Sequence, residues 1–182
     1  RASISLVDAE HGVPGGDDGG ETKKGLEGAD LSPDGAIAQR IRAKFAAQES
    51  LPVSSFRVQP ADGRGLGLFA EEPIPAGTYL FDFLGDLIEQ DEFDARYPGA
   101  TVAEYVASVG AADGRLLYVD ARHTMLAPAR YMNHFETPNC VMWTMCEPTP
   151  RLMLFTSVDI AAGDELGWDY GVGYWRGRQD KV

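Results

Sequence analysis

Apolar residues along most of the chain recur in short runs separated by glycine and proline, a pattern typical of short β-strands. Phe56 and Val58 alternate with polar neighbours, and residues 78–83 are rich in aromatic and β-branched side chains. The strands predicted in this way cover about residues 56–58, 66–69, 78–83, 116–119, 140–145, 151–156 and 165–168. We therefore predict a mainly β fold with small helical inserts, in the α+β class.

Two segments show helical spacing instead. Ser32-Pro33 suits an N-cap and a first helical position, and the apolar residues that follow predict a helix over about residues 34–49. Farther along, Thr101 and Glu104 have the spacing of a capping box. The apolar residues that share a helical face around them are Val102, Val106 and Val109. We therefore predict a helical insert over about residues 89–110.

Residues 1–35 form a leader with eight glycines and eight acidic residues. Such a composition cannot bury enough apolar surface to offset the entropy of ordering, so we predict that the leader is disordered. The rest divides into an N-terminal helix and connector at 36–54 and one folded domain at 55–182. The leader contains eight of the 28 acidic and three of the 16 basic residues, so the remaining 20 acids and 13 bases carry a net charge of −7.

Composition narrows the classes of function. The net charge of −12 disfavours binding to a phosphate backbone, which depends on Lys and Arg contacts. A cationic partner matches the charge better, although acidity can also serve solubility alone. The only cysteines, Cys140 and Cys146, are too few for a disulfide-stapled scaffold or a zinc site made mainly of thiolates. No apolar stretch approaches the roughly 20 residues that span a bilayer, so we expect no membrane partner.

The first candidate for chemistry is the glycine-rich stretch Gly63-Arg64-Gly65-Leu66-Gly67-Leu68. It does not fit a dinucleotide-binding fingerprint, because Leu68 stands where the third glycine belongs and residues 69–73 do not open a helix. The glycines therefore either form a simple turn or let the backbone approach a ligand closely.

The second candidate is the segment 130–140, which is dense in side chains that hydrogen-bond or titrate. His134 and Cys140 allow a thiol-hydrolase interpretation, but no third group at a defined place would orient the histidine. In the alternative interpretation, the Asn and His side chains satisfy backbone groups of an irregular loop.

The third candidate is the segment 163–175. Its carboxylates include Asp164, which is best explained as a solvated turn residue. Its clustered aromatic residues are Trp168, Tyr170, Tyr174 and Trp175. These rings either fill the core or line a narrow channel that receives an alkyl cation through cation–π attraction.

The order and spacing of these three stretches together resemble the SET domain of protein lysine methyltransferases. Residues 63–70 look like the opening glycine motif of that family. The segment 130–140 is similar to the family's Arg-Phe-x-Asn-His-Ser-x-x-Pro-Asn-Cys run, and residues 158–171 match its closing motif. The resemblance extends from about Ser55 to Tyr174, so it covers most of the predicted folded domain at 55–182.

The resemblance implies a fold of several small sheets with a C-terminal pseudoknot. It also implies S-adenosylmethionine (SAM) as cofactor and a lysine-bearing basic peptide as substrate, with a histone tail as the default. By motif match, the expected SAM-binding residues are Gly65, Leu66, Gly67, Arg130, Asn133 and His134. Tyr170 is the expected catalytic residue. The expected lining of the lysine channel is Phe83, Trp168, Tyr174 and Trp175, and no metal is expected.

Departures from the family pattern keep a second hypothesis open. Phe83 and Phe135 stand where the family usually has Tyr and Ser, so two hydroxyls are lost. These losses motivate the alternative of a non-catalytic SET-like module that binds a peptide. Our main prediction is a SAM-dependent protein-lysine N-methyltransferase with no direct nucleic-acid partner, and nuclear residence follows only from the histone expectation.

Overall fold

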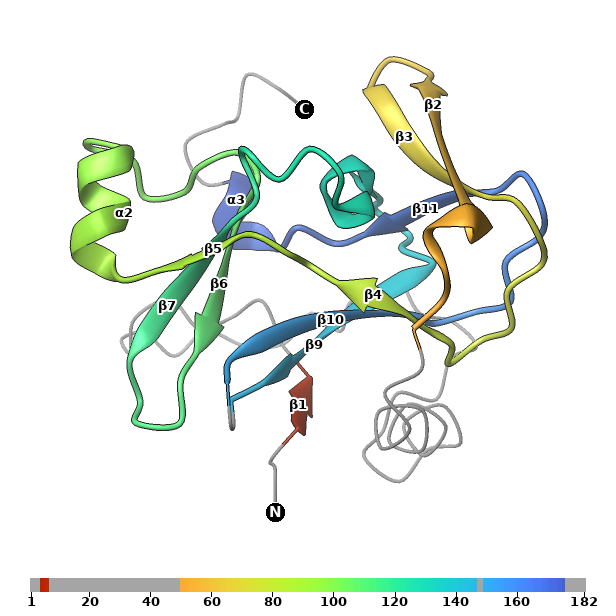
Figure 1. The fold of residues 1–182 in the computed structure, drawn as a ribbon. Helices are drawn as coiled ribbons and strands as arrows, with labels where there is room; N and C mark the ends of the chain where they lie inside the picture. The colour runs from red at the N-terminus through yellow and green to blue at the C-terminus, as the bar shows by residue number, and fades with distance from the viewer. Residues whose placement is uncertain (1–3, 7–49, 147–148, 176–182) are drawn as a thin grey trace, which may run out of the picture.

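The computed structural model describes residues 4–6, 50–146 and 149–175, and three small sheets dominate this part of the chain (Figure 1). The first sheet has the strand order β1-β9-β10-β4. Its strands are β1 (Ile4–Leu6), β9 (Cys140–Met145), β10 (Arg151–Thr156) and β4 (Tyr79–Asp82). The described part thus confirms the predicted fold of several small sheets with few helices.

The second sheet has the order β2-β3-β11-β8, and the third has the order β5-β7-β6. The strands of the second are β2 (Phe56–Ala61), β3 (Gly65–Ala70), β11 (Glu165–Trp168) and β8 (Asn133–His134). Those of the third are β5 (Asp86–Ile88), β7 (Leu116–Asp120) and β6 (Val106–Gly110). The helical elements are η1 (Val53–Ser55), α2 (Gln90–Arg96), η2 (Pro128–Tyr131) and α3 (Val172–Trp175).

The main core lies where the three sheets meet. Leu68 of β3, Leu154 of β10 and Val119 of β7 all belong to one cluster of buried side chains. The opposite face of β10 belongs to a second cluster, in which Met153 and Phe155 are fully buried. Because both faces of β10 are covered, the strand reads as a continuous apolar run rather than an alternation.

β11 joins two parts of the chain that are far apart in sequence. On one side it pairs antiparallel with β3, with Leu166 opposite Leu68. On the other side it pairs in parallel with β8, with Gly167 opposite Asn133 and Trp168 opposite His134. Every other strand pair in the described part of the chain is antiparallel. The closing segment is therefore held between the glycine-rich strand and the Asn-His segment (Figure 1).

The helical insert expected over about 89–110 is only partly correct. α2 ends at Arg96, and residues 106–110 form strand β6 instead of a second helix. Tyr105 has a φ of +63°, a left-handed conformation that breaks any helix before the strand begins. The valines expected on a helical face suit β6 because β-branched residues pack well on a pleated strand.

The expected disorder of the leader is wrong for Ile4–Leu6, which pair with Trp143–Met145 at the edge of β9. The helix expected over about 34–49 lies outside the described residues. None of the described helices is long and apolar enough to cross a membrane.

Candidate functional site

The parallel pairing of β8 with β11 brings together the Asn-His pair and the closing aromatic residues. It places His134 opposite Trp168, and the backbone N–H of Phe135 donates to the carbonyl of Trp168 at 3.2 Å. Asn139 supports the same junction. Its side chain donates to the carbonyl of Glu165 at 2.8 Å and accepts from the N–H of Gly167 at 2.9 Å. The segment 130–140 is therefore a scaffold for the site as well as a source of its side chains.

Asn133 links the glycine-rich strand to β11. Its Nδ2 donates to the carbonyl of Leu66 at 3.1 Å and to Oε1 of Glu165 at 2.7 Å. The other carboxylate oxygen of Glu165 pairs with Arg64 at 2.6 Å. A Cβ at Gly67 would stand 2.6 Å from Glu165 Oε1 and 3.0 Å from the Cβ of Ala61, so a larger residue there would displace the end of this carboxylate. The sequence motif thus encodes a close approach between β3 and β11.

Part of β3 is open on the side that faces Asn133. β11 pairs with β3 only at Leu68 and Phe69, whereas residues 65–67 pair only with β2. Gly65 has a φ of +78°, and no atom lies within 4 Å of where its Cβ would be. Backbone N–H and C=O groups on this edge are obligatory hydrogen-bonding groups. Leu66 lies opposite Pro60, which has no N–H, so the backbone groups of Leu66 point away from β2. Because its carbonyl already accepts from Asn133, the N–H of Leu66 is the group placed to bind a polar ligand.

His134 lies beside the closing aromatic residues. Its Nδ1 accepts the backbone N–H of Tyr170 at 3.2 Å, so in this arrangement the ring proton sits on Nε2. The imidazole also packs edge-on against Trp175, with ring centroids 4.9 Å apart. These contacts fix both the tautomer and the orientation of the ring, and they attach Tyr170 and Trp175 to β8.

The hydroxyl of Tyr170 donates to the carbonyl of Met132 at 2.7 Å. Burial, and to a lesser degree the electrostatic influence of Tyr174, Tyr105 and Glu165, raises the pKa of this phenol well above its ordinary value. The phenol therefore stays neutral at physiological pH. Because its proton is committed to a backbone carbonyl, the oxygen can still accept a hydrogen bond from a ligand.

A row of aromatic rings surrounds Tyr170. The ring of Trp168 lies 5.0 Å from that of Tyr170 and 6.4 Å from that of Phe83. Tyr174 packs edge-on against Tyr170 at 4.8 Å and contacts Trp175 at 5.0 Å. Of the four residues expected to line a lysine channel, Trp168 and Tyr174 contact Tyr170 directly, and Phe83 and Trp175 are each one ring farther along the row. Such ring faces can attract a cation or provide a dry, apolar wall.

Trp168 has a second set of contacts. Its side chain is partly buried against the main core, and its indole Nε1 is buried with no hydrogen-bond partner among the described residues. An indole N–H buried in this way usually finds a partner. Trp168 is therefore both a wall of the core and a neighbour of Tyr170.

Arg130, in η2, uses Nη1 within the chain, whereas its buried Nε has no hydrogen-bond partner among the described residues. Its Nη1 donates to the carbonyls of Ala121 and Arg122 at 3.1 and 2.7 Å. The guanidinium lies over the ring of Tyr105, 4.3 Å from its centroid. Sequence reasoning missed Tyr105, because it lies in a stretch that was expected to be helical. Only the positive φ identifies it, and that is not visible in the sequence.

Two further residues in the segment 130–140 have structural explanations. The ring of Phe135 covers Gly167 so closely that a Cβ there would stand 2.3 Å from it, and Arg64 lies over the other part of the ring at 5.1 Å. Cys140 is buried, and burial strongly raises the pKa of its thiol. A thiol nucleophile requires a lowered pKa, so this environment argues against the thiol-hydrolase alternative.

A cleft of about 420 Å³ lies elsewhere, at the far end of the third sheet. Leu87 and Arg115 contribute to its lining, together with Cys146 at the end of β9. The guanidinium of Arg115 pairs with Glu89 and Asp113, so its charge is already balanced within the chain. The cleft is separate in sequence and in its lining residues from the aromatic row.

Comparison with known proteins gives a consistent result. A family model of the SET domain matches residues 65–171. The chain is 32% identical over 116 residues to histone-lysine N-methyltransferase EHMT1 of Homo sapiens, an alignment that covers 61% of this chain and 9% of that protein. It is 34% identical over 110 residues to the H3 lysine-4 specific histone-lysine N-methyltransferase of Yarrowia lipolytica, covering 57% of this chain and 9% of that protein.

Solved structures show the same likeness. The methyltransferase domain of human histone-lysine N-methyltransferase SETMAR is similar with a TM-score of 0.53 and 25% identity, over 63% of this chain and 44% of that one. CpSET8 from Cryptosporidium is similar with a TM-score of 0.58 and 23% identity, over 78% of this chain and 68% of that one. The second likeness concerns the fold alone.

Proposed function

Because the chain belongs to the SET-domain family, we propose that it is a SAM-dependent protein-lysine N-methyltransferase that acts on a basic peptide. The observation that supports this most is the pairing of β8 with β11, which gathers three motifs at one place. Asn133 and His134, the open edge of β3 and Tyr170 with its aromatic neighbours all meet there. The same three motifs carried the resemblance in the sequence.

The residues present fit SAM. Gly65 and Gly67 carry no side chain that would cover the open edge, and the N–H of Leu66 offers a backbone donor there. Asn133 and His134 offer an amide and an imidazole beside it. When bound, SAM supplies a methyl group on a positively charged sulfur. Aromatic faces such as those of the rings beside Tyr170 suit a ligand with this charge. Arg130 already bonds to two carbonyls of this chain, so we propose that it shapes the SAM site more than it binds the cofactor.

The chain's own residues would prepare the lysine for attack. A methyl group moves to nitrogen when the C–S bond breaks as the N–C bond forms, so the lysine amine must first lose its proton to solvent. The ordinary lysine pKa of about 10.4 opposes this at neutral pH. A dry wall formed by Phe83, Trp168 and Tyr174 would disfavour the ammonium form and so lower that pKa.

Tyr170 would act by positioning. Its raised pKa excludes the phenolate at neutral pH, so the residue is not a general base. Its hydroxyl proton is held by Met132, which leaves the oxygen lone pairs aimed away from that bond. These lone pairs can accept an N–H of the neutral amine and fix the direction of attack.

A histone tail is the proposed substrate class. The relatives described above are named as histone-lysine methyltransferases, and the acid excess of this chain suits a peptide rich in Lys and Arg. Nuclear residence is proposed only as a consequence of this substrate. The alignments cover 9% of each of those relatives, so the wider activities of the long proteins are not carried over.

A non-catalytic peptide-binding module is the second candidate. Phe135, one of the two residues that motivated it, has a packing role against Gly167 and Arg64. The loss of a hydroxyl there therefore says little about activity. Phe83, the other residue, is buried in the main core, and its ring centroid lies 6.4 Å from that of Trp168. The absence of a hydroxyl at Phe83 is therefore the observation that still favours this candidate.

Transfer of label from methyl-labelled SAM to a panel of histones, followed for the wild type and Tyr170→Phe, tests the proposal. We expect the variant to bind SAM normally and to lose at least about tenfold in kcat, because only the hydroxyl is removed. SAM binding by calorimetry serves as the control. Binding without transfer by the wild type would favour the non-catalytic module, and equal rates for both proteins would remove Tyr170 from the mechanism.

A further inference from the structure

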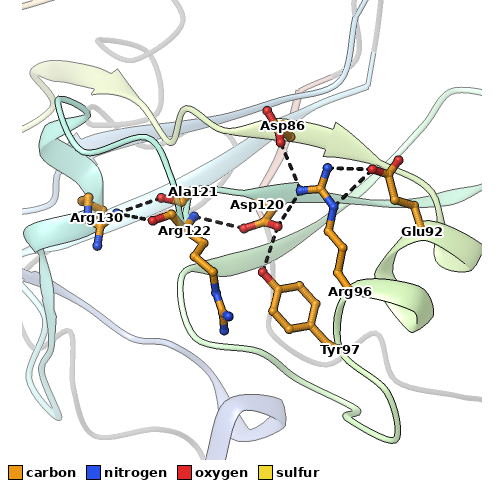
Figure 2. Close-up of polar contacts among 8 residues, drawn as sticks. All are labelled: Asp86, Glu92, Arg96, Tyr97, Asp120, Ala121, Arg122 and Arg130. Atoms are coloured by element: carbon orange, nitrogen blue, oxygen red, sulfur yellow. Dashed lines mark hydrogen bonds and ion pairs between the residues drawn. The ribbon is translucent and has the colours of Figure 1, made fainter.

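Asp120, at the end of β7, is the centre of a buried polar cluster that no sequence motif announced (Figure 2). Its Oδ2 accepts hydrogen bonds from Arg96 Nη1 and from the Tyr97 hydroxyl, both at 2.8 Å. Its Oδ1 accepts the backbone N–H of Arg122 at 3.0 Å. The carboxylate thus holds the end of α2 on one side and its own following backbone on the other.

Arg96 spreads this attachment further. Besides Asp120 it contacts Asp86 of β5 at 3.0 Å and Glu92 of α2 at 2.6 Å. Figure 2 shows its guanidinium between the three carboxylates. One arginine on α2 therefore connects the helix to two strands of the third sheet. The Asp120 carboxylate is the only buried member of the three, so it makes the least solvated of these contacts.

The backbone directly after Asp120 is attached to the site. The N–H of Ala121 donates to the carbonyl of Tyr105 at 2.8 Å. The carbonyls of Ala121 and Arg122 both accept from Arg130, whose guanidinium stacks on the Tyr105 ring. A Cβ at Gly85 would stand 2.4 Å from the Asp120 carbonyl, so this backbone is also pressed against the turn that follows Phe83.

Arg130 continues the connection towards Tyr170. It lies in η2, and the N–H of Met132 donates to the carbonyl of Ala129 in the same short helix at 3.2 Å. The Met132 carbonyl is the group that holds the Tyr170 hydroxyl. A displacement of the 120–122 backbone would therefore reach Tyr105 through one hydrogen bond and η2 through Arg130.

We propose that Asp120 is a positioning residue for the methyl-transfer site. Its hydrogen bonds fix the backbone at 120–122 relative to α2, and this backbone in turn positions Tyr105 and η2. Arg96, the last residue of α2, and Tyr97, which follows it as the C-cap, hold this carboxylate, and Arg130 bonds the following backbone to η2. The inference rests on the proposed function, and it goes beyond it by assigning the α2 insert a part in the geometry of the reaction.

A second cluster of the same chemistry provides a matched control. In the first sheet, the Tyr79 hydroxyl donates to Asp82 at 2.6 Å, and Arg151 pairs with the same carboxylate at 2.7 Å. Tyr97→Phe and Tyr79→Phe each remove one phenol that donates to an Asp–Arg pair. Only the first of these pairs is followed by backbone that bonds to Arg130 and Tyr105.

The experiment measures steady-state methyl transfer and amide hydrogen exchange by NMR for the wild type and both variants. For Tyr97→Phe we expect faster exchange at Ala121 and Arg122 and a kcat lowered by about tenfold with a nearly unchanged peptide KM, because a misplaced group costs rate more than binding. For Tyr79→Phe we expect kcat within about twofold of the wild type, although its thermal stability also falls.

The results distinguish failure of the positioning role of Asp120 from failure of the proposed methyltransferase function. Equal kcat values for the two variants, or unchanged exchange at Ala121 and Arg122 in Tyr97→Phe, would overturn the inference. If the wild type transfers no methyl group, the proposed function fails separately. Exchange at the amides of Met132 and Tyr170 then tests the positioning role alone: faster exchange in Tyr97→Phe supports it, and unchanged exchange refutes it.

Discussion

A single buried carboxylate shows how residue chemistry connects stability to the site. Desolvation acts to raise the pKa of Asp120, but the hydrogen bonds from the Arg122 N–H, Arg96 and Tyr97 outweigh it, so the net effect lowers the pKa. The charged form is thus the one that the folded state favours. Removing this carboxylate, or one of the partners that hydrogen-bond to it, leaves a buried polar or charged group unpaired and lowers the free energy of unfolding.

The lowered pKa of Asp120 predicts a specific loss of stability in acid. Asp120 contributes stability above its unfolded pKa of about 3.9, and this contribution disappears as pH falls through the lower folded value. We expect the free energy of unfolding of the wild type to decrease from about pH 5 downward. Chemical denaturation across this range measures it.

Asp120→Asn is the control for the acid prediction. The amide cannot titrate, so the variant should be less stable at neutral pH and lose less stability on acidification than the wild type. Parallel pH profiles for the two proteins would show that other carboxylates dominate the response.

Sequence motifs located the residues with distinctive chemistry but missed those that support them. Asn133, His134 and Tyr170 were predicted from a motif, and the structure brings them together. Asp120 and Tyr105 were not identified, because an Asp at the end of a strand and a Tyr in an apolar stretch look ordinary in a sequence. Their importance depends on tertiary contacts with α2 and η2, which are distant from them along the chain.

At the scale of elements, the β8–β11 junction determines the site. Gly167 and Phe135 meet there so closely that a methyl group at Gly167 would stand 2.3 Å from the ring. Phe135 stands where the family usually has serine. The pair therefore forms a steric match, in which the missing side chain of one residue makes room for the ring of the other.

This match predicts a measurable coupling. We expect Gly167→Ala to lower the free energy of unfolding by about 1–3 kcal/mol, as overpacking of a tight contact does. Phe135→Ser should remove most of the penalty of the alanine, so the double variant should be more stable than the sum of the single changes predicts. Denaturant titration of the four proteins gives the coupling, and additive effects would show that the ring moves aside without cost.

The insert shows where periodicity fails at the same scale. Its first half is helical as predicted, but the valines of the second half are compatible with both a helical face and a strand. Val106 pairs with Asp120 and Val109 with Leu117, and this pairing with β7 stabilises the strand over the helix. A cross-strand partner some ten residues away in sequence is information that a local pattern does not contain.

For the whole molecule, the net charge of −12 predicts how a basic substrate is attracted. Interactions between exposed charges are screened over about 8 Å at physiological ionic strength. We therefore expect the KM for a Lys- and Arg-rich peptide to rise as salt is added, while kcat changes little. Steady-state kinetics at several NaCl concentrations checks this, with SAM affinity as the control. A KM that does not depend on salt would mean that the acidity serves solubility alone.

Mass spectrometry of a histone-tail peptide after incubation with SAM tests whether this chain methylates a lysine with Tyr170 as its catalytic residue. We expect a mass gain of methyl groups on a lysine side chain with the wild type and its near absence with Tyr170→Phe, although both proteins bind SAM. An unmodified peptide with SAM-bound wild type would show that the chain does not methylate it, and equal modification by both proteins would show that Tyr170 is not the catalytic residue.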